Sequence, residues 1–562
     1  MPDKSYKGLL ISDFTLDNFA QQLIHDSDPP LIEAVPAPFG QIQAVLVDPG
    51  HPIWNKSPFD FAVVWTQPQA VIEYFGNLLQ YQPVDLDKLL AQVDDYCMML
   101  NNLPEQVRFI FVPTWLRLPP ALGFGLLEMT PNAGISHTLY EMNLRLSKNL
   151  SGESNIFVLD ATRWLSATGS KAFNPKLWYM AKIPFANEVF AEAVKDVKAA
   201  LNALTGNARK LIVVDLDETL WGGIVGDDGW ENLRLGGHDH IGESYVDFQR
   251  TLKALTNRGI LLGVVSKNDE NIALEAIDKH PEMVLKRDDF AGWRINWNDK
   301  VQNIVELVDE LNLGLQSVVF LDDNPMERAW VRESLPEVFV PEMPEDKLLY
   351  PNTVLELRCF DNPSVSSEDL QRANMYVTER KRKELRTTSG SLADWLLTLD
   401  VQVTIEPLND TNQARTVQLL NKTNQMNLTT RRLTESELTS WDSLADHCLW
   451  VFRVSDKFGD SGLTGIVSLV VEESRGRIID FILSCRVMGR NIEEAMVRKV
   501  FQYARSLGLA EIYADYLPTK KNKPCLDFWK RSGFDFNEKN SRFSWPLDRE
   551  YPPPEGVRVI EK

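Results

Sequence analysis

Short apolar runs alternate with segments of helical periodicity along the first part of the chain. The apolar runs are KGLLISDF, IQAVLV, FDFAVVW, QVRFIFVPT and NIFVLD, and the helical stretch EVFAEAVKDVKAALNAL closes the block. Buried strands that alternate with helices are typical of an α/β layer with a mostly parallel sheet. The pattern therefore predicts an α/β domain over residues 1–205.

A second block, residues 206–360, repeats this alternation. Strand-like KLIVVDLD, ILLGVVSK and SVVFLDDN are separated by helical YVDFQRTLKALTNRG and KVQNIVELVDELNLG. Each strand-like run ends in polar residues. Because ligands bind at the carboxyl ends of strands in open α/β sheets, this block predicts a Rossmann-like core with its site at that edge.

The remaining chain has a different order of elements. Strand-like VQVTIEPL, CLWVFRVSD, TGIVSLVVEE and RIIDFILSCRV precede the helical NIEEAMVRKVFQYARSLG and a further run, AEIYADY. Strands followed by a long helix indicate an α+β domain, which we assign to residues 392–545. The charged segment 361–391 is predicted as a linker helix, and 546–562 as an extended tail. The fold class is therefore multi-domain α/β.

Composition narrows the functional classes. The 562 residues carry a formal net charge of -20, which argues against nucleic-acid binding because such proteins usually present a basic face. No apolar run approaches the roughly 18 residues of a membrane helix, and the N-terminus has no signal-peptide pattern. The five scattered cysteines form no CxxC pair, so we expect neither a disulfide framework nor a zinc site, and a cytoplasmic protein.

The stretch LIVVDLDETLWGG contains the first candidate chemistry. Asp215 and Asp217 follow four apolar residues directly. An aspartate at a strand end can attack phosphorus or bind Mg²⁺. A second aspartate two residues later can serve as general acid or base.

A phosphoryl-transfer site needs further groups, and they occur in order along the same block. Ser266 follows GILLGVV and can donate to a phosphate oxygen, and Lys300 begins a helix and can offset negative charge. Asp322 and Asp323 end SVVFLDD and can complete a metal site. Each residue alone is more often a cap, a turn or a solvated side chain, but the ordered set favours phosphoryl chemistry.

These motifs resemble a known family. DLDETLWGG, VVSKND, NDK and FLDDNPMER are similar to the four motifs of the haloacid dehalogenase superfamily, and LWGGIVGDDG and HPEMVLKRDDFAGWRINW resemble its FkbH-like branch. LLNKTNQMNLTTRRLT, DKFGDSGLTG and SCRVMGRNIEEA resemble the C-terminal region of that branch, which has a GNAT-like fold. The resemblance covers about residues 205–545.

The resemblance implies a role for each matching residue. Asp215 would be nucleophile and Mg²⁺ ligand. Asp217 would be the general acid/base and would reach the metal through its main-chain carbonyl. Asp322 would be the remaining ligand, with Asp323 close by. Substrate phosphate would be held by Thr219, Ser266 and Lys300.

The size of the site bears on its substrate. Only 34 positions (300 − 266) separate Ser266 from Lys300, and the glycine-rich segment between Gly223 and Tyr245 predicts a flap hairpin but not a large cap domain. His238 and His240 in this flap are more simply read as solvated loop residues. An open site with a minimal cap favours a substrate presented by a protein.

The FkbH-like resemblance implies a specific reaction. Such proteins transfer the glyceryl group of 1,3-bisphosphoglycerate, with loss of phosphate, to the phosphopantetheine thiol of an acyl carrier protein in polyketide-type pathways. An enzyme cysteine can carry the acyl group first. Cys485 is the candidate, because it lies beside Arg486 before the turn RVMGRN into a helix; the alternative is a small buried strand residue.

Two segments differ from the patterns of the folds that they resemble, the turn RVMGRN and the opening KGLLISDFTLDNFA. RVMGRN is poorer in glycine than the GNAT turn that holds pantetheine and pyrophosphate, which argues against ordinary acetyl-CoA use. KGLLISDFTLDNFA resembles the opening of SGNH-type hydrolases, but Phe14 occupies the serine position and no matching histidine follows. We therefore expect a degenerate, non-catalytic SGNH-like domain at 1–205.

Three functions remain open from sequence. The first is a glyceryl transferase/phosphatase that acts with a carrier protein. The second is a Mg²⁺-dependent phosphatase of a small phosphorylated metabolite. The third is a carrier-protein docking scaffold with a vestigial phosphatase core.

Overall fold

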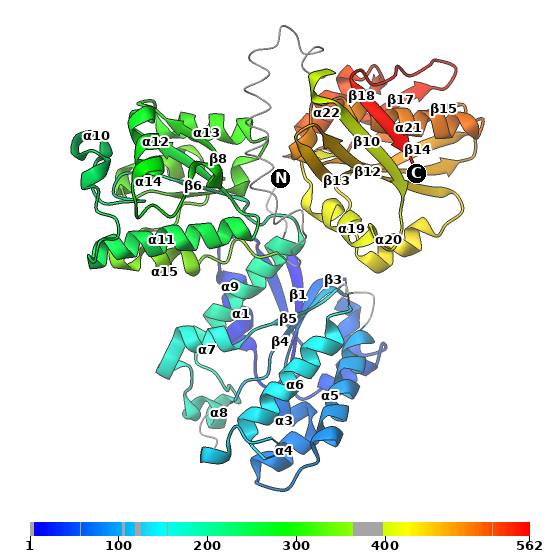
Figure 1. Cartoon of the computed structure of the whole chain (residues 1–562). Coiled ribbons are helices and arrows are strands. Elements are labelled where there is room, and N and C mark those ends of the chain that lie inside the picture. The colour runs from blue at the N-terminus through cyan, green and yellow to red at the C-terminus, as the bar shows by residue number, and fades with distance from the viewer. Residues whose placement is uncertain are drawn as a thin grey trace. The chain divides into compact units, whose positions relative to one another are not determined.

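The computed structural model describes residues 5–56, 58–103, 107–117, 125–131, 133–153, 155–362, 397–519 and 521–562. The chain divides into two compact units, 1–201 and 202–562. The described residues form a five-stranded, a four-stranded and a nine-stranded sheet (Figure 1). The predicted multi-domain α/β class is confirmed. The predicted linker helix at 361–391 lies, after Asn362, outside the described residues.

The first unit contains a wholly parallel sheet in the order β2-β1-β3-β4-β5. One face packs against helices α2, α4, α5 and α6 in a continuous apolar cluster. On the other face, Trp65 at the end of β3 contacts the rings of Phe19, Trp164 and Phe190. Both faces are thus covered, as parallel sheets require. The strands are β1 (Tyr6–Ser12), β2 (Ile32–Pro36), β3 (Phe59–Trp65), β4 (Val107–Pro113) and β5 (Ile156–Leu159).

One predicted strand of this unit is a helix. IQAVLV forms α2, with Ile42, Val45 and Leu46 buried on one side. The i, i+3, i+4 spacing of these residues fits helical rather than strand periodicity. The helices are α1 (Asp17–His25), α2 (Ile42–Val47), α3 (Pro68–Val71), α4 (Glu73–Leu79), α5 (Leu86–Asn101), α6 (Ile135–Leu150), α7 (Thr162–Thr168), α8 (Pro175–Ala181) and α9 (Asn187–Leu204).

The four-stranded sheet is also wholly parallel, in the order β8-β7-β6-β9. Successive residues of β6 face opposite sides: Leu211 and Val213 belong to one apolar cluster, Ile212 and Val214 to another. This period of two explains the unbroken apolar run of the sequence, because both faces are buried. The strands are β6 (Leu211–Val214), β7 (Leu261–Ser266), β8 (Phe290–Ile295) and β9 (Val318–Leu321).

The segment between β6 and α11, where the sequence predicts a flap, is short. The predicted flap contains α10 and the 3-10 turn η4, and a single antiparallel bridge between Gly222 and Arg234 closes it. It is therefore two helical turns rather than a hairpin, and His240 already belongs to the next helix. The helical elements are α10 (Val225–Asp228), η4 (Trp230–Asn232), α11 (His240–Asn257), α12 (Glu270–Lys279), α13 (Lys300–Glu310), α14 (Pro325–Ser334), η7 (Lys347–Leu349) and α15 (Tyr350–Leu355).

The third sheet is mixed, in the order β16-β17-β15-β14-β13-β12-β10-β18, with β11 paired to β14. One apolar cluster joins it to α21 and α22, and another to α19 and α20. The elements are β10 (Val401–Pro407), α19 (Gln413–Lys422), β11 (Met426–Asn427), α20 (Glu435–Asp442), β12 (His447–Asp456), β13 (Gly459–Glu472), β14 (Arg475–Leu483), η8 (Cys485–Val487), α21 (Ile492–Ser506), β15 (Glu511–Asp515), α22 (Lys523–Arg531), β16 (Asp535–Asn537), β17 (Arg542–Pro546) and β18 (Val557–Glu561).

The predicted tail at 546–562 is part of this sheet. Val557–Glu561 forms β18, which pairs in parallel with β10 from Val401 to Ile405. Tyr551, just before it, is fully buried. The short alternating run VRVIE therefore completes a sheet edge instead of extending into solvent.

No helix in the described part of the chain is both long enough and apolar enough to cross a membrane.

Candidate functional site

Two adjacent strands end in aspartates at the same edge of the four-stranded sheet. β6 and β9 pair with Val214 opposite Leu321, so Asp215 and Asp322 follow in the same register. The main-chain N–H of Asp215 donates to the carbonyl of Leu321 over 3.0 Å. This register places both side chains at the carboxyl edge, where ligands bind in open α/β sheets.

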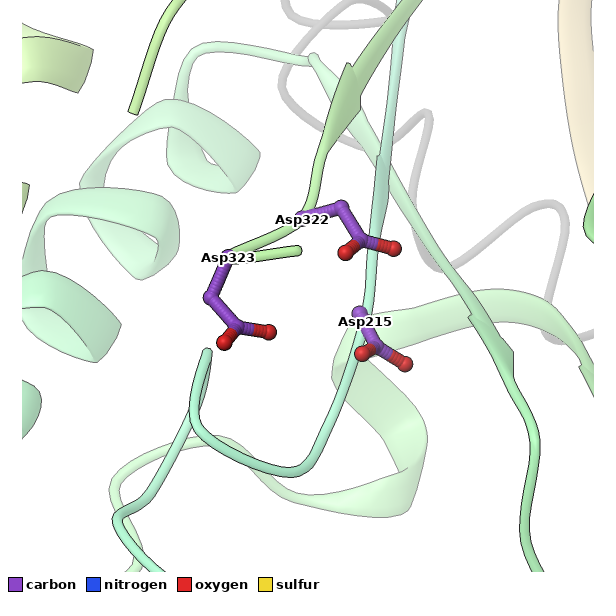
Figure 2. Close-up of side chains that lie close together, drawn as sticks. All are labelled: Asp215, Asp322 and Asp323. Atoms are coloured by element: carbon purple, nitrogen blue, oxygen red, sulfur yellow. The ribbon is translucent and has the colours of Figure 1, made fainter. Parts of the chain in front are cut away.

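The side chains of Asp215, Asp322 and Asp323 lie close together (Figure 2). One oxygen from each lies within 4.8 Å of the others. Oδ1 of Asp215 is buried and has no hydrogen-bond partner among the described residues. A buried acceptor without a donor is costly, and hard divalent cations prefer carboxylate oxygens. This donor set and the unpaired oxygen fit Mg²⁺.

Lys300 places a buried ammonium group between two of these carboxylates. It is the first residue of α13, is 4% exposed, and lies next to the helix cap Asp299. Its Nζ lies 2.6 Å from Oδ2 of Asp322 and 3.1 Å from Oδ2 of Asp215. The lysine thus joins the two strand-end carboxylates and leaves Oδ1 of Asp215 to another partner.

Burial and crowded charge shift the pKa values of these groups. Burial raises the pKa of Asp322 to about 6, and the neighbouring Asp215 carboxylate adds to the rise. Burial also raises the pKa of Asp323. For Lys300, burial alone would lower the pKa, but the two carboxylates outweigh it and raise the pKa above its ordinary value. The site therefore holds more negative charge than one lysine offsets.

Asp217 has a separate environment. Its carboxylate accepts hydrogen bonds from Nε1 of Trp221 (2.9 Å), the N–H of Val225 (3.1 Å) and Nδ2 of Asn268 (2.7 Å). Burial raises its pKa despite these donors. The side chain does not belong to the three-carboxylate group, so a role on the metal through its main-chain carbonyl stays a prediction. A carboxyl group with a raised pKa suits proton transfer.

The two hydroxyl residues of the predicted site differ in their contacts. Ser266 is the last residue of β7, beside β6, and is 2% exposed. Thr219 is fully buried; its Oγ1 accepts from the N–H of Asp323 (3.1 Å) and lies 3.3 Å from Oδ1 of the same residue. Thr219 thus positions Asp323 in this structure, and phosphate binding by either hydroxyl remains a prediction.

Sequence reasoning missed three residues that support the site. Asn268, 3% exposed, orients Asp217 as described above. Nη1 of Arg328 donates to the carbonyls of Asp322 (2.9 Å) and Asp323 (2.7 Å). Lys347 reaches the site from η7. Asn268 and Arg328 lie within the recognised motifs, whereas no motif marks Lys347.

Cys485 lies at the end of β14, in the mixed sheet. It begins the 3-10 turn η8, is half-buried, and is not one of the residues gathered around Asp215. The neighbouring cations have partners: Nε of Arg486 lies 3.1 Å from Oγ of Ser484, and Arg490 forms a buried ion pair with Asp456 at 3.1 Å. A role for Cys485 as acyl carrier stays a prediction.

One main-chain donor in the turn after Cys485 is already bonded within the chain. The N–H of Gly489 donates to Oε1 of Glu493 over 2.9 Å. Glu493 is 2% exposed, and burial raises its pKa. The chain's own carboxylate therefore occupies a main-chain donor at the start of α21 that an anion would use, and this part of the turn does not fit CoA.

Phe14, which occupies the serine position of the SGNH-type opening, lies two residues beyond Ser12, the last residue of β1. Its ring is 2% exposed and contacts Trp65 and Phe185, with ring centroids 5.6 Å and 5.8 Å away. A buried aromatic packed in this way is a core residue, and a non-catalytic, SGNH-like role for the first unit stays a prediction.

Comparison with known proteins gives one informative similarity. No protein-family model matches the chain, and no curated protein matches it. The chain is similar to the solved N-terminal part of the protein BF1531 from Bacteroides fragilis, which contains a phosphatase domain and is complexed with Mg. The identity is 29%, the TM-score is 0.58, and the match covers 64% of this chain and 95% of that one.

Weaker similarities involve acetyltransferases. The ribosomal-protein-S18-alanine N-acetyltransferase from Escherichia coli matches 26% of this chain and 96% of its own at 9% identity and a TM-score of 0.21. A GNAT-family acetyltransferase from Staphylococcus aureus Mu50 matches 26% and 99% at 10% identity and a TM-score of 0.21. At these TM-scores neither similarity defines the fold of the mixed sheet.

Proposed function

We propose that the carboxyl edge of the four-stranded sheet is a Mg²⁺-dependent phosphoryl-transfer site, and that this chain is an enzyme with phosphatase and acyl-transfer activity. The observation that carries the proposal is the buried group of three carboxylates beside Lys300, with Oδ1 of Asp215 unpaired. The phosphatase-domain structure from Bacteroides fragilis, which contains Mg, supports the same assignment.

The residues divide the chemistry among them. Asp215, Asp322 and Asp323 would hold Mg²⁺, which supplies positive charge to the phosphate oxygens when bound. A carboxylate oxygen of Asp215 forms the bond to phosphorus while the leaving oxygen takes a proton from Asp217. Water then attacks the phosphorus, gives a proton to Asp217, and releases phosphate and free Asp215.

Two further residues would orient the phosphate during this reaction. The ammonium group of Lys300 balances the charge of Asp215 and the transferred group, and the Ser266 hydroxyl donates to a phosphate oxygen. Both residues are buried at the edge where Asp215 ends its strand. Because their positions are fixed, these two residues would hold the phosphate with its phosphorus in line with the attacking oxygen of Asp215.

We propose that the substrate is 1,3-bisphosphoglycerate and that the glyceryl group passes to the phosphopantetheine thiol of an acyl carrier protein. The FkbH-like motifs and the small flap support this finer assignment. A thiolate attacks the acyl phosphate carbonyl and expels inorganic phosphate, and the Asp215 site hydrolyses the remaining phosphate ester. In this proposal Cys485 carries the glyceryl group before the carrier protein does.

The test incubates the protein with 1,3-bisphosphoglycerate, Mg²⁺ and a holo carrier protein, and measures phosphate and the intact mass of the carrier. A carrier mass increased by one glyceryl unit supports glyceryl loading. Phosphate release without carrier acylation reduces the proposal to a phosphatase of small metabolites. If neither occurs while the carrier still binds, the chain is a docking scaffold.

A further inference from the structure

Lys347 is a second lysine at the phosphoryl-transfer site, and no motif predicts it. Its Nζ donates to the carbonyl oxygen of Glu218 over 2.7 Å and lies 2.8 Å from the hydroxyl of Tyr350. The same Nζ is 3.6 Å from Oδ2 of Asp323. The side chain is 21% exposed, so its position is largely fixed by these contacts.

Glu218, whose carbonyl oxygen accepts from Lys347, has an uncommon main-chain conformation. It stands between Asp217 and Thr219 with a φ of +55°, in the left-handed region that non-glycine residues seldom adopt. Its Oε1 accepts from the N–H of Gly223 over 2.7 Å, and its carbonyl oxygen also lies 3.3 Å from the hydroxyl of Tyr245. Side-chain and main-chain contacts together hold this residue in an uncommon conformation.

The turn at Glu218 determines where the reacting groups point. Asp215 and Asp217 precede it and Thr219, which holds Asp323, follows it. A donor fixed on the Glu218 carbonyl therefore restrains the peptide between Glu218 and Thr219, in the turn that directly follows Asp217. We propose that Lys347 is a positioning residue that fastens this turn, and this proposal rests on the phosphoryl-transfer function given above.

The charge of Lys347 allows a positioning role to be distinguished from general destabilisation of the site, because the two predict different Mg²⁺ affinities. Its ammonium group lies close to Asp323 and therefore repels a divalent cation bound by that carboxylate. Removing the charge should leave Mg²⁺ affinity unchanged or increase it, while loss of the contact to Glu218 should slow the chemical step. A merely destabilised site would lose both metal affinity and rate.

The experiment compares Lys347→Met and Lys347→Arg with Lys279→Met, an exposed lysine of α12 paired only on the surface with Glu275. Hydrolysis of p-nitrophenyl phosphate gives kcat and KM, calorimetry gives the Mg²⁺ affinity, and hydrogen exchange reports on the peptide 215–225. For Lys347→Met we expect kcat to fall at least about tenfold with KM and Mg²⁺ affinity maintained, and faster exchange in that peptide. Arginine should recover most of the rate.

Two results would overturn the inference. One is a Lys347→Met protein with wild-type kcat and exchange; the other is a rate loss that accompanies weaker Mg²⁺ binding. If the wild-type protein hydrolyses no phosphate ester, the proposed function fails, but the exchange of peptide 215–225 still decides whether Lys347 fastens the turn.

Discussion

Acidic groups, cations and main-chain donors occur both at the edge of the four-stranded sheet and in the turn between β14 and α21. The two regions differ in whether these groups already have partners within the chain. At the sheet edge, three carboxylates crowd together and Oδ1 of Asp215 is buried without a partner among the described residues. At the turn, the N–H of Gly489 is bonded to Glu493, and Arg490 is paired with Asp456.

At the sheet edge a buried acceptor has no donor, whereas at the turn the N–H of Gly489 and the side chain of Arg490 are already paired within the chain. Burial makes these ionised carboxylates costly, and their mutual repulsion adds to the cost, as the raised pKa of Asp322 shows. A bound cation removes that cost. In contrast, a donor already bonded to a buried glutamate gains little from an external anion, because the glutamate must first be displaced.

The largest expected effect tests the sheet edge directly. Asp215→Asn removes both the proposed nucleophile and a metal ligand, so phosphate release should fall by more than about 10⁴-fold. Phosphate release from a phosphate ester is measured with excess Mg²⁺. Asp278→Asn is the matched control, because Asp278 lies on the surface of α12 and pairs with Arg287, away from the sheet edge. A fully active Asp215→Asn protein would remove the nucleophile assignment.

The next test separates the two regions. Cys485→Ala should abolish transfer of the glyceryl group to the carrier protein and should change phosphate release from a simple ester by less than about twofold. Intact mass of the enzyme after incubation with substrate shows whether an acyl group is attached. A stable acyl-enzyme in the alanine variant would mean that another residue carries the group, and Cys485 would then be a half-buried structural residue.

Much of this site could be predicted because its chemistry follows strand ends. The run LIVV contains no polar residue, which predicts a strand buried on both faces. Asp215 directly follows this run, as Asp322 follows VVFL. When β6 and β9 pair in parallel, the two aspartates that follow them come to lie side by side. Lys300 was predictable for a similar reason, since it begins the helix after a recognised motif.

Other features depend on long-range contacts that no local pattern encodes. Lys347 reaches the Glu218 carbonyl across 129 positions, and the sequence around it has no distinctive spacing. IQAVLV was misread as a strand because a short apolar run does not reveal whether one side or both will be buried. The last strand, β18, was missed because its partner β10 lies far back in the chain.

A smaller, graded effect follows from the charge at the sheet edge. Asp322 has a pKa of about 6 without metal, and Mg²⁺ binds the ionised carboxylate, so protons compete with the metal below that pH. The apparent dissociation constant should be flat above pH 6 and should rise about tenfold for each pH unit below it. Calorimetry in buffers of different ionisation enthalpy measures both the affinity and the proton release. An affinity independent of pH down to about pH 5 would mean either that Asp322 is not a ligand or that its pKa lies below this range.

The smallest expected effect concerns the turn. Acetyl-CoA at about 1 mM should shift the melting temperature of the wild-type protein by less than about 1 °C, because Glu493 occupies the N–H of Gly489. Glu493→Gln keeps the size of the side chain and removes its negative charge, so any CoA affinity should appear first in this variant; Glu435→Gln, at an exposed position of α20, is the control. If the wild-type protein were itself stabilised by several degrees, bonding of Gly489 within the chain would not prevent anion binding. The contrast between the two regions would then rest on the carboxylates of the sheet edge alone.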